Sequence, residues 1–115
     1  MNMRLGERAL AEYFAKRSGC KVQVGAVLSD NWGIFKGSWN HPGPNCRGAH
    51  AEAEALKRVN RRRLRGAKII VAAFRNGKMI LARPCEEICL PLLKKYNLTI
   101  MEYSTKEGVY KIERI

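Results

Sequence analysis

The segment that most constrains the fold is a run of six apolar residues, 69–74, which follows Lys68. A strand that presents apolar side chains on both faces must be covered on both, so it belongs in the middle of a sheet with helices on each side. A chain of 115 residues is long enough for one such core and too short for two. We therefore expect a single domain spanning residues 1–115.

Helical and extended patterns alternate on either side of this strand. Apolar residues at helical spacing predict a helix over 4–17, and the runs 21–29 and 32–39 predict a β-hairpin. The remaining expected elements are a helix over 49–64, a helix over 85–96, and two strands over 98–104 and 109–115. Residues 79–82 either extend the central strand or cross as a loop. The order α-β-β-α-β-α-β-β predicts a three-layer α/β domain with a five-stranded mixed sheet, its last two strands antiparallel.

The cysteines favour a metal site over a disulfide framework. The N-terminus carries charged residues where a secretory signal would need an apolar core, and no apolar run is long enough to span a bilayer. We therefore expect a soluble, cytoplasmic protein with no membrane partner. In such a protein, metal ligation or free thiols are the usual roles of cysteine. The chain has four, of which Cys20 has the pattern of a buried small residue; the others are Cys46, Cys85 and Cys89.

Two short motifs stand where the second and third helices are expected to begin. His50-Ala51-Glu52 opens one, and Cys85 follows Pro84 at the start of the other, with Cys89 four residues on. Free N–H groups and partial positive charge at helix N-termini favour thiolates, the form of cysteine that binds metals. One imidazole and two thiolates suit Zn²⁺ and leave a fourth position for water. The motifs therefore predict one Zn²⁺ per chain, held by His50, Cys85 and Cys89.

Glu52 is the candidate catalytic residue, because a carboxylate beside zinc-activated water can accept its proton and pass it to a substrate. Two points stay open. Cys85 and Cys89 enclose three residues where two are usual, although positions four apart still share a helix face. Cys46 could add a fourth protein ligand, which would make the zinc structural instead of catalytic.

These motifs, with residues 22–28 and 37–40, resemble the cytidine deaminase superfamily. The first half is similar to tRNA adenosine deaminases, and the second half looks more like compact phage-type cytidine and deoxycytidylate deaminases. The resemblance implies an α/β/α cytidine deaminase-like fold, catalytic zinc, substrate contacts from Asn40 and Ala51, and assembly into a homo-oligomer. Asn40 could equally be a turn residue ahead of Pro42. The short link between the last two strands favours cytosine over adenine as the substrate base.

Basic residues outnumber acidic ones by 22 to 10, which gives a formal charge of +12. Six of them fall within residues 57–66, and this run predicts a nucleic-acid-binding surface, with a solvated helix end as the alternative. The candidate contacts in this run are Arg58, Arg61, Arg62, Arg63 and Arg65. Trp32 and Trp39 could stack on an unpaired base, but their alternating strand positions favour core packing.

Three functions remain compatible with the sequence. The first is hydrolytic deamination of cytosine to uracil in single-stranded DNA or RNA, including tRNA. The second is the same reaction on free cytidine, deoxycytidine or (d)CMP, with a pyrimidine nucleotide as the partner. The third is a nucleic-acid-binding module in which zinc is structural.

Overall fold

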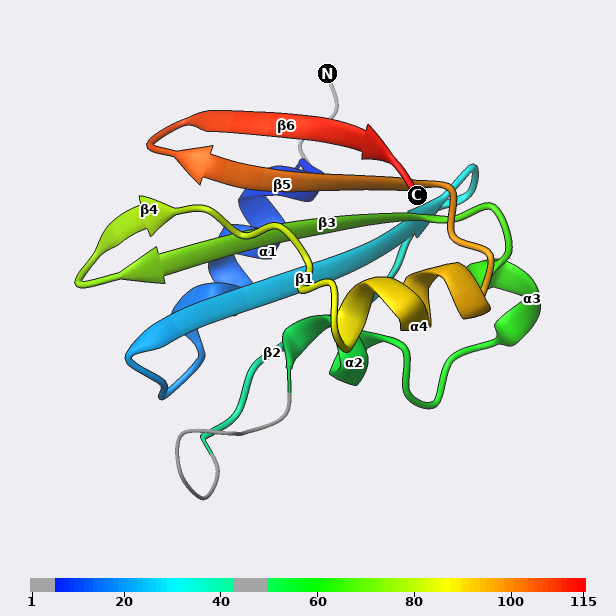
Figure 1. The fold of residues 1–115 in the computed structure, drawn as a ribbon, viewed down its shortest axis with the longest axis horizontal. Coiled ribbons are helices and arrows are strands. Elements are labelled where there is room, and N and C mark those ends of the chain that lie inside the picture. Colours follow the sequence, from blue (N-terminus) through cyan, green and yellow to red (C-terminus); the bar gives the residue numbers. More distant parts are fainter. Residues whose placement is uncertain (1–5, 43–49) are drawn as a thin grey trace.

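The structure is a computed structural model that describes residues 6–42 and 50–115. Over these residues the chain forms one mixed sheet of six strands with helices on both faces (Figure 1). The elements are α1 (Glu7–Lys16), β1 (Val22–Asp30), β2 (Gly33–Trp39), α2 (Ala51–Ala55), α3 (Arg61–Leu64), β3 (Lys68–Arg75), β4 (Lys78–Ile80), α4 (Cys89–Lys95), β5 (Ile100–Lys106) and β6 (Val109–Arg114). None of the helices in this part of the chain is long and apolar enough to cross a membrane.

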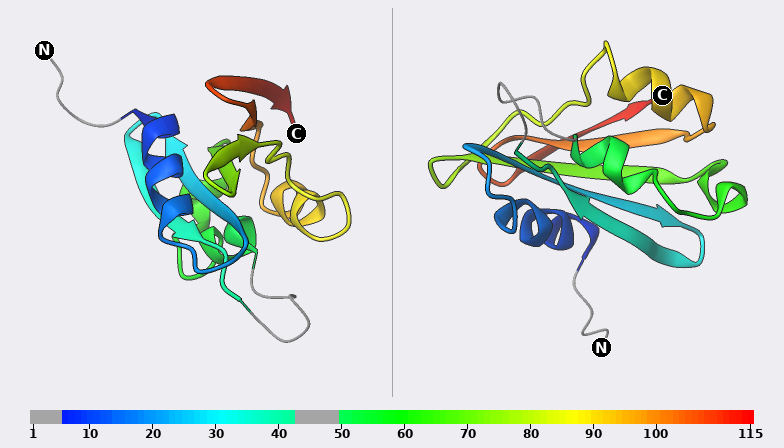
Figure 2. Two further views of the ribbon diagram at one scale, coloured as in Figure 1. Left: turned by 90° about the vertical axis from the view of Figure 1, so that its left-hand side faces the viewer. Right: turned by 90° about the horizontal axis from the view of Figure 1, so that it is seen from below.

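Strand β3 lies at the centre of the sheet, as the apolar run predicts. The strand order is β2-β1-β3-β5-β6, and all six apolar residues of β3 are buried. Its alternate side chains face different layers: Ile70 and Phe74 pack with α1, whereas Ile69 and Val71 pack with α2 and α4 (Figure 2). The three-layer prediction is therefore confirmed. So is the antiparallel pairing of the last two strands, because β5 runs parallel to β3 and β6 returns antiparallel to β5.

Helix α1 covers one face of β1 and β3 at very close range. Ala11 and Ala15 are fully buried, and a Cβ placed on Gly25 of β1 would lie 2.2 Å from the carbonyl oxygen of Ala11. Only glycine permits this backbone-to-backbone approach, which is the physical reason for a glycine inside a strand.

The single helix expected over 49–64 is wrong, because two short helices, α2 and α3, occupy this segment. Arg58 between them has φ 54°, a left-handed conformation that ends a helix. Asn60 then caps α3, since its side-chain oxygen accepts a hydrogen bond from the Arg62 N–H at 2.9 Å. An asparagine inside the expected helix was the sequence signal for this break.

The helix expected from residue 85 begins instead at Cys89. Pro91 explains the difference, because a proline seven residues into a helix would lack the N–H that bonds to the preceding turn and would clash with it. In α4 as observed, Pro91 lies in the first turn, where that N–H has no intrahelical partner in any case.

Residues 79–82 neither extend β3 nor form only a loop. Strand β4 pairs antiparallel with residues 73–75 of β3, while β5 pairs with residues 68–71 on the same side. The additional strand β4 therefore pairs with the part of β3 that β5 does not reach. The segment that follows β4 leads to Cys85.

Trp32 was expected in the core and lies instead at the tip of the β1–β2 hairpin, 90% exposed. The Asp30 carboxylate accepts a hydrogen bond from the Trp32 N–H at 2.9 Å, which is the geometry of a turn. Trp39 is partly buried, with its ring stacked on Phe14 at a centroid distance of 5.9 Å.

Candidate metal centre and pocket

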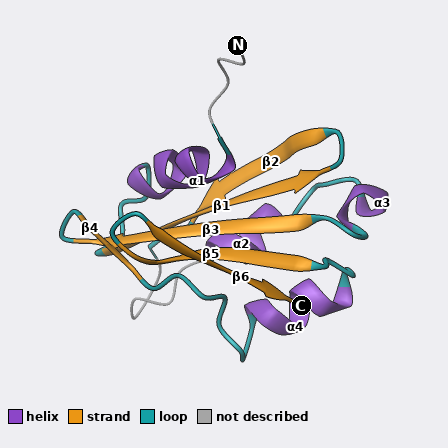
Figure 3. Ribbon diagram, turned by 90° about the horizontal axis from the view of Figure 1, so that it is seen from above, coloured by secondary structure: helices purple, strands orange, loops and turns teal. Residues whose placement is uncertain are grey.

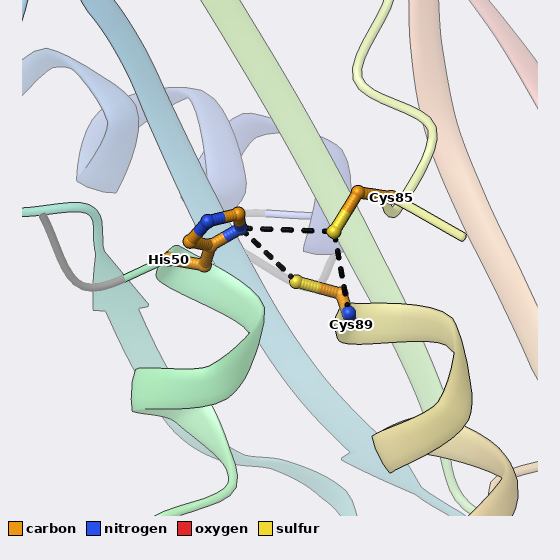
Figure 4. Close-up of side chains that lie close together, drawn as sticks. All are labelled: His50, Cys85 and Cys89. Carbon is orange, nitrogen blue, oxygen red and sulfur yellow. Dashed lines mark hydrogen bonds between the residues drawn. The ribbon is translucent and has the colours of Figure 1, made fainter. Parts of the chain in front are cut away.

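Three side chains from separate segments converge beside the sheet (Figure 4). His50 stands immediately before α2, Cys85 lies on the chain between β4 and α4, and Cys89 is the first residue of α4. The His50 Nδ1 is 3.3 Å from the Cys89 Sγ and 3.8 Å from the Cys85 Sγ. All three donor atoms lie within 4.8 Å of one another.

These donors fit a zinc ion in chemistry and in separation. Zn–N bonds of about 2.05 Å and Zn–S bonds of about 2.3 Å at a tetrahedral angle place nitrogen and sulfur about 3.6 Å apart. The observed separations of 3.3 and 3.8 Å fall on either side of that value. The group is therefore one that could hold a metal ion without a large rearrangement.

The three-residue gap between the cysteines is accommodated because Cys85 precedes the helix. The Leu90 N–H donates to the Cys85 carbonyl oxygen at 2.8 Å, and the Cys89 N–H lies 3.3 Å from the Cys85 sulfur. This wide turn brings both sulfurs to the same side of α4. A regular helix from residue 85, as the sequence suggested, is not needed for the pair to converge.

Metal binding at the centre is coupled to the protonation of Cys89. Burial, followed by the nearby charge of Glu52, raises the pKa of the Cys89 thiol well above its usual range. A divalent cation reverses this effect, because it stabilises the thiolate and displaces the proton.

Glu52 is buried in the first turn of α2, with 6% of its surface exposed. Burial raises the pKa of its carboxyl, against the opposing effects of its own backbone N–H, of His50 and of a hydrogen bond to Cys89. Ser38 of β2 fixes the start of this helix, since its buried hydroxyl donates to the Ala51 carbonyl oxygen at 2.6 Å. A buried carboxyl group is thus held beside the donor cluster, within hydrogen-bonding reach of Cys89.

A pocket of ≈650 Å³ opens beside the cluster. Its walls are the segment before β1, the first residues of β1, the end of β2, the first turn of α2 and the chain before Cys85. Both residues predicted to contact substrate, Asn40 and Ala51, line it. Cys20 also lines this pocket and is partly exposed, so the expectation of a buried Cys20 is wrong.

The Asn40 amide is already engaged with β1. Its Oδ1 accepts from the Val24 N–H at 2.8 Å, and its Nδ2 donates to the Val22 carbonyl oxygen at 2.9 Å. Asn40 therefore fixes the end of β2 against β1 at the pocket wall. A substrate contact from its remaining hydrogen or lone pair stays a prediction.

Three cations at the pocket were not anticipated from the sequence. Lys21 and Arg75 are exposed and have no ion pair within residues 6–42 and 50–115. Arg83 is held by Glu113, whose carboxylate accepts from its Nε at 2.9 Å and also from the Tyr103 hydroxyl. The sequence signal for Arg75 was its position as the last residue of the central strand, which pairs with Val22 at the start of β1.

The basic run lies elsewhere. Helix α3 stands beyond the start of β3 (Figure 3). The pocket is lined by Ala73 and Arg75, which lie at the opposite end of that strand. Arg63 is occupied, since it forms two hydrogen bonds to Asp30 at 2.7 and 2.8 Å and covers the Phe35 ring at 4.3 Å. Nucleic-acid binding by Arg58, Arg61, Arg62 and Arg65 stays a prediction. Cys46, the candidate fourth zinc ligand, lies outside the described residues.

Comparison with known proteins identifies the fold. No family model and no curated protein matches the sequence. Among solved structures, a cytidine deaminase from Burkholderia pseudomallei superposes with a TM-score of 0.72 at 20% identity, covering 94% of this chain and 89% of that one. The apo dCMP deaminase from the cyanophage S-TIM5 superposes with a TM-score of 0.65 at 19% identity, covering 89% and 82%. The chain therefore has the cytidine deaminase-like fold.

Proposed function

We propose that this protein is a zinc-dependent deaminase that hydrolyses the 4-amino group of cytosine. The observation that carries the proposal is the convergence of His50, Cys85 and Cys89 next to the buried carboxyl group of Glu52. Of these residues, His50, Glu52 and Cys85 line one pocket. A cytidine deaminase and a dCMP deaminase share the fold, which favours cytosine as the base.

In the proposed reaction, water adds to C4 of cytosine and ammonia leaves, so that uracil is formed. Zinc held by His50, Cys85 and Cys89 supplies the Lewis acidity that makes water nucleophilic near neutral pH. Glu52 accepts one proton from the attacking water and delivers it to the ring nitrogen, which keeps it in uracil. It then takes the remaining proton from the hydroxyl added at C4 and delivers it to the amine, so that ammonia leaves as the C4 carbonyl forms. Its burial keeps that proton from exchanging with bulk water during the transfer.

The pocket walls hold the base for this transfer. Asn40 and Ala51 line the side that carries Glu52, so the polar edge of the base is proposed to face them. Ala51 is the first residue of α2, where backbone N–H groups lack intrahelical partners and can donate to a ligand.

The substrate is proposed to carry a phosphate, because Lys21 and Arg75 are exposed cations at the pocket without ion-pair partners among the described residues. A (deoxy)cytidine nucleotide meets this requirement with the residues of the pocket alone. Cytosine within single-stranded DNA or RNA is the second candidate, favoured by the basic surface at the α3 end of the molecule.

A substrate panel tests the proposal. Zinc-loaded protein is incubated with cytidine, dCMP, single-stranded DNA, duplex DNA and tRNA, and the uracil product is quantified. Glu52→Gln should lower kcat by about 10²-fold or more at unchanged zinc content, in line with the contribution of general acid–base catalysis. Glu54→Gln, two residues further along α2, is the matched control and should leave kcat unchanged. Absence of uracil from every substrate, or an active Glu52→Gln, would contradict the proposal.

The phosphate requirement has its own test. Arg75→Gln should raise the KM for dCMP by about 10-fold or more, as expected for a lost hydrogen bond to a charged group, and leave the KM for cytidine unchanged. Equal changes for both substrates would exclude a phosphate contact by Arg75.

A further inference from the structure

A groove at the α3 end of the sheet carries three cations that have no ion-pair partner among the described residues. The groove has a volume of ≈750 Å³ and is lined by the loop after α3, by the end of α4 with the loop that follows it, and by the end of β6. Each of these segments contributes one cation: Arg65, Lys94 and Arg114. All three are exposed, and none has an ion pair within residues 6–42 and 50–115.

The acidic side chains near this end of the molecule are already paired. All ten Asp and Glu residues of the chain fall within the described residues. Next to α3, Asp30 is bound to Arg63, and Glu54 of α2 is bound to Lys57 at 2.6 Å. At the start of β3, Glu102 contacts Lys68 and Arg8. The three groove cations are therefore available to an external anion.

Backbone hydrogen bonds hold the groove in shape. The Gly66 N–H donates to the Asn97 carbonyl oxygen at 2.8 Å, and the Thr99 N–H donates to the Ala67 carbonyl oxygen at 3.0 Å. The Ile115 N–H donates to the Thr99 carbonyl oxygen at 2.9 Å. Because these bonds join all three lining segments, the cations stand on a preformed surface, and binding does not require the backbone to be ordered first.

An aromatic side chain flanked by cations belongs to the same end of the molecule. Tyr96, which follows α4, is partly exposed, and its ring centroid lies 5.5 Å from the Arg61 guanidinium and 5.7 Å from the Lys95 Nζ. Tyr96 lies near the groove and not in its lining, with part of its side chain packed against the core. A positively charged groove with aromatic side chains nearby is typical of sites for single-stranded nucleic acid, where the groove cations meet phosphates. Membrane-surface sites present an apolar face to the lipid instead.

We propose that the groove of Arg65, Lys94 and Arg114 binds the phosphates of single-stranded nucleic acid at a site separate from the pocket. Strand β3 separates the two sites, and its eight residues span roughly 23 Å. That distance is more than twice the Debye length of about 8 Å at physiological salt, so the groove and the pocket act as independent electrostatic sites. The groove can thus hold a polynucleotide whether or not one of its bases is a substrate.

Binding of a labelled oligothymidylate, followed by fluorescence anisotropy over a range of salt concentrations, tests this site. The oligomer contains no cytosine, so the result does not depend on the proposed reaction. The triple variant Arg65→Gln/Lys94→Gln/Arg114→Gln should bind at least about 10-fold more weakly at low salt. The slope of log K against log salt should fall by about 2, because each phosphate contact on a single strand contributes about 0.7.

The matched control removes the same charge from exposed lysines of β4, β5 and β6 that do not line the groove, as Lys78→Gln/Lys106→Gln/Lys111→Gln, and should keep the wild-type slope. Single Lys94→Gln should change the slope by about 0.7, which keeps the test valid if the triple variant fails to fold. Equal slopes for the two triple variants would overturn the proposal. So would wild-type protein that binds anionic vesicles and no oligomer, or that binds neither.

Discussion

Replacing Ser104 with alanine should destabilise the fold beside the metal centre. The side chain of Ser104, on β5, is fully buried. Its hydroxyl accepts a hydrogen bond from the Ala73 N–H of β3 at 3.2 Å and donates one to the Ile80 carbonyl oxygen of β4 at 2.7 Å. The Ala82 N–H in turn donates to the Ser104 carbonyl oxygen at 2.9 Å. One residue thus joins three chain segments, of which the last leads into Cys85.

The size of the effect follows from these two hydroxyl bonds. Ser104→Ala removes a partner from one buried N–H and one buried carbonyl, and leaving a buried group without a partner costs about 1–3 kcal/mol. The two together give an expected loss of about 2–6 kcal/mol in the free energy of unfolding. Such a loss is a large fraction of the free energy of unfolding of a typical domain, which is about 5–15 kcal/mol.

Urea unfolding at a fixed free zinc concentration measures this loss. Thr105→Ala is the matched control, because the Thr105 hydroxyl also donates to a backbone carbonyl, that of Val109 at 3.0 Å, but in an exposed hairpin where water can replace it. The control should change stability by less than about 0.5 kcal/mol. If Ser104→Ala is no less stable than Thr105→Ala, the assigned role of this hydroxyl is wrong.

Gly25→Ala should destabilise the protein by about 1–3 kcal/mol, because the new methyl group would clash with backbone atoms of α1. Gly19→Ala is the control and should have little effect, since no atom lies within 4 Å of the added methyl group. Thermal unfolding of the two variants measures the difference. The Arg63 guanidinium lowers the pKa of Asp30, so the ion pair stabilises the folded state above a pH of about 4. In urea unfolding, wild type should be more stable than Asp30→Asn above this pH, and the difference in stability should disappear as the pH falls below it. Glu113→Ala should weaken zinc binding, measured by competition with a chelator, because it releases Arg83 next to Pro84. Glu113→Gln should weaken zinc binding less, since an amide oxygen can still accept the hydrogen bond from Arg83. Equal zinc affinities of wild type and both variants would show that this contact does not support the metal-binding loop.

The central strand was predictable because hydrophobic burial follows directly from the residue pattern, and the order of the elements was predictable except for the split between α2 and α3 and the short strand β4. Ile69 through Phe74 leave no polar side chain for solvent, so their placement required no tertiary information. Residue chemistry likewise sufficed to nominate His50, Cys85 and Cys89, because few donor sets suit zinc. The break at Asn60 and the start of α4 at Cys89, two residues before Pro91, also had local signals.

Other features depend on contacts that residue spacing does not encode. The cationic groove combines Arg65, Lys94 and Arg114, which come from three distant segments and meet only because β5 lies parallel to β3 with β6 beside it. The arginine run precedes β3 and Arg75 ends it, so the two lie at opposite ends of one strand. A local count of basic residues therefore suggests an anionic partner without indicating where it binds.

X-ray absorption at the zinc edge, combined with metal analysis, tests the central claim most directly. One zinc per chain should have two sulfur ligands, one imidazole nitrogen and one oxygen, and Cys46→Ser should retain the metal whereas His50→Ala should lose it. A third sulfur ligand that disappears in Cys46→Ser, or a purified chain that binds no zinc, would contradict the catalytic site described for this fold.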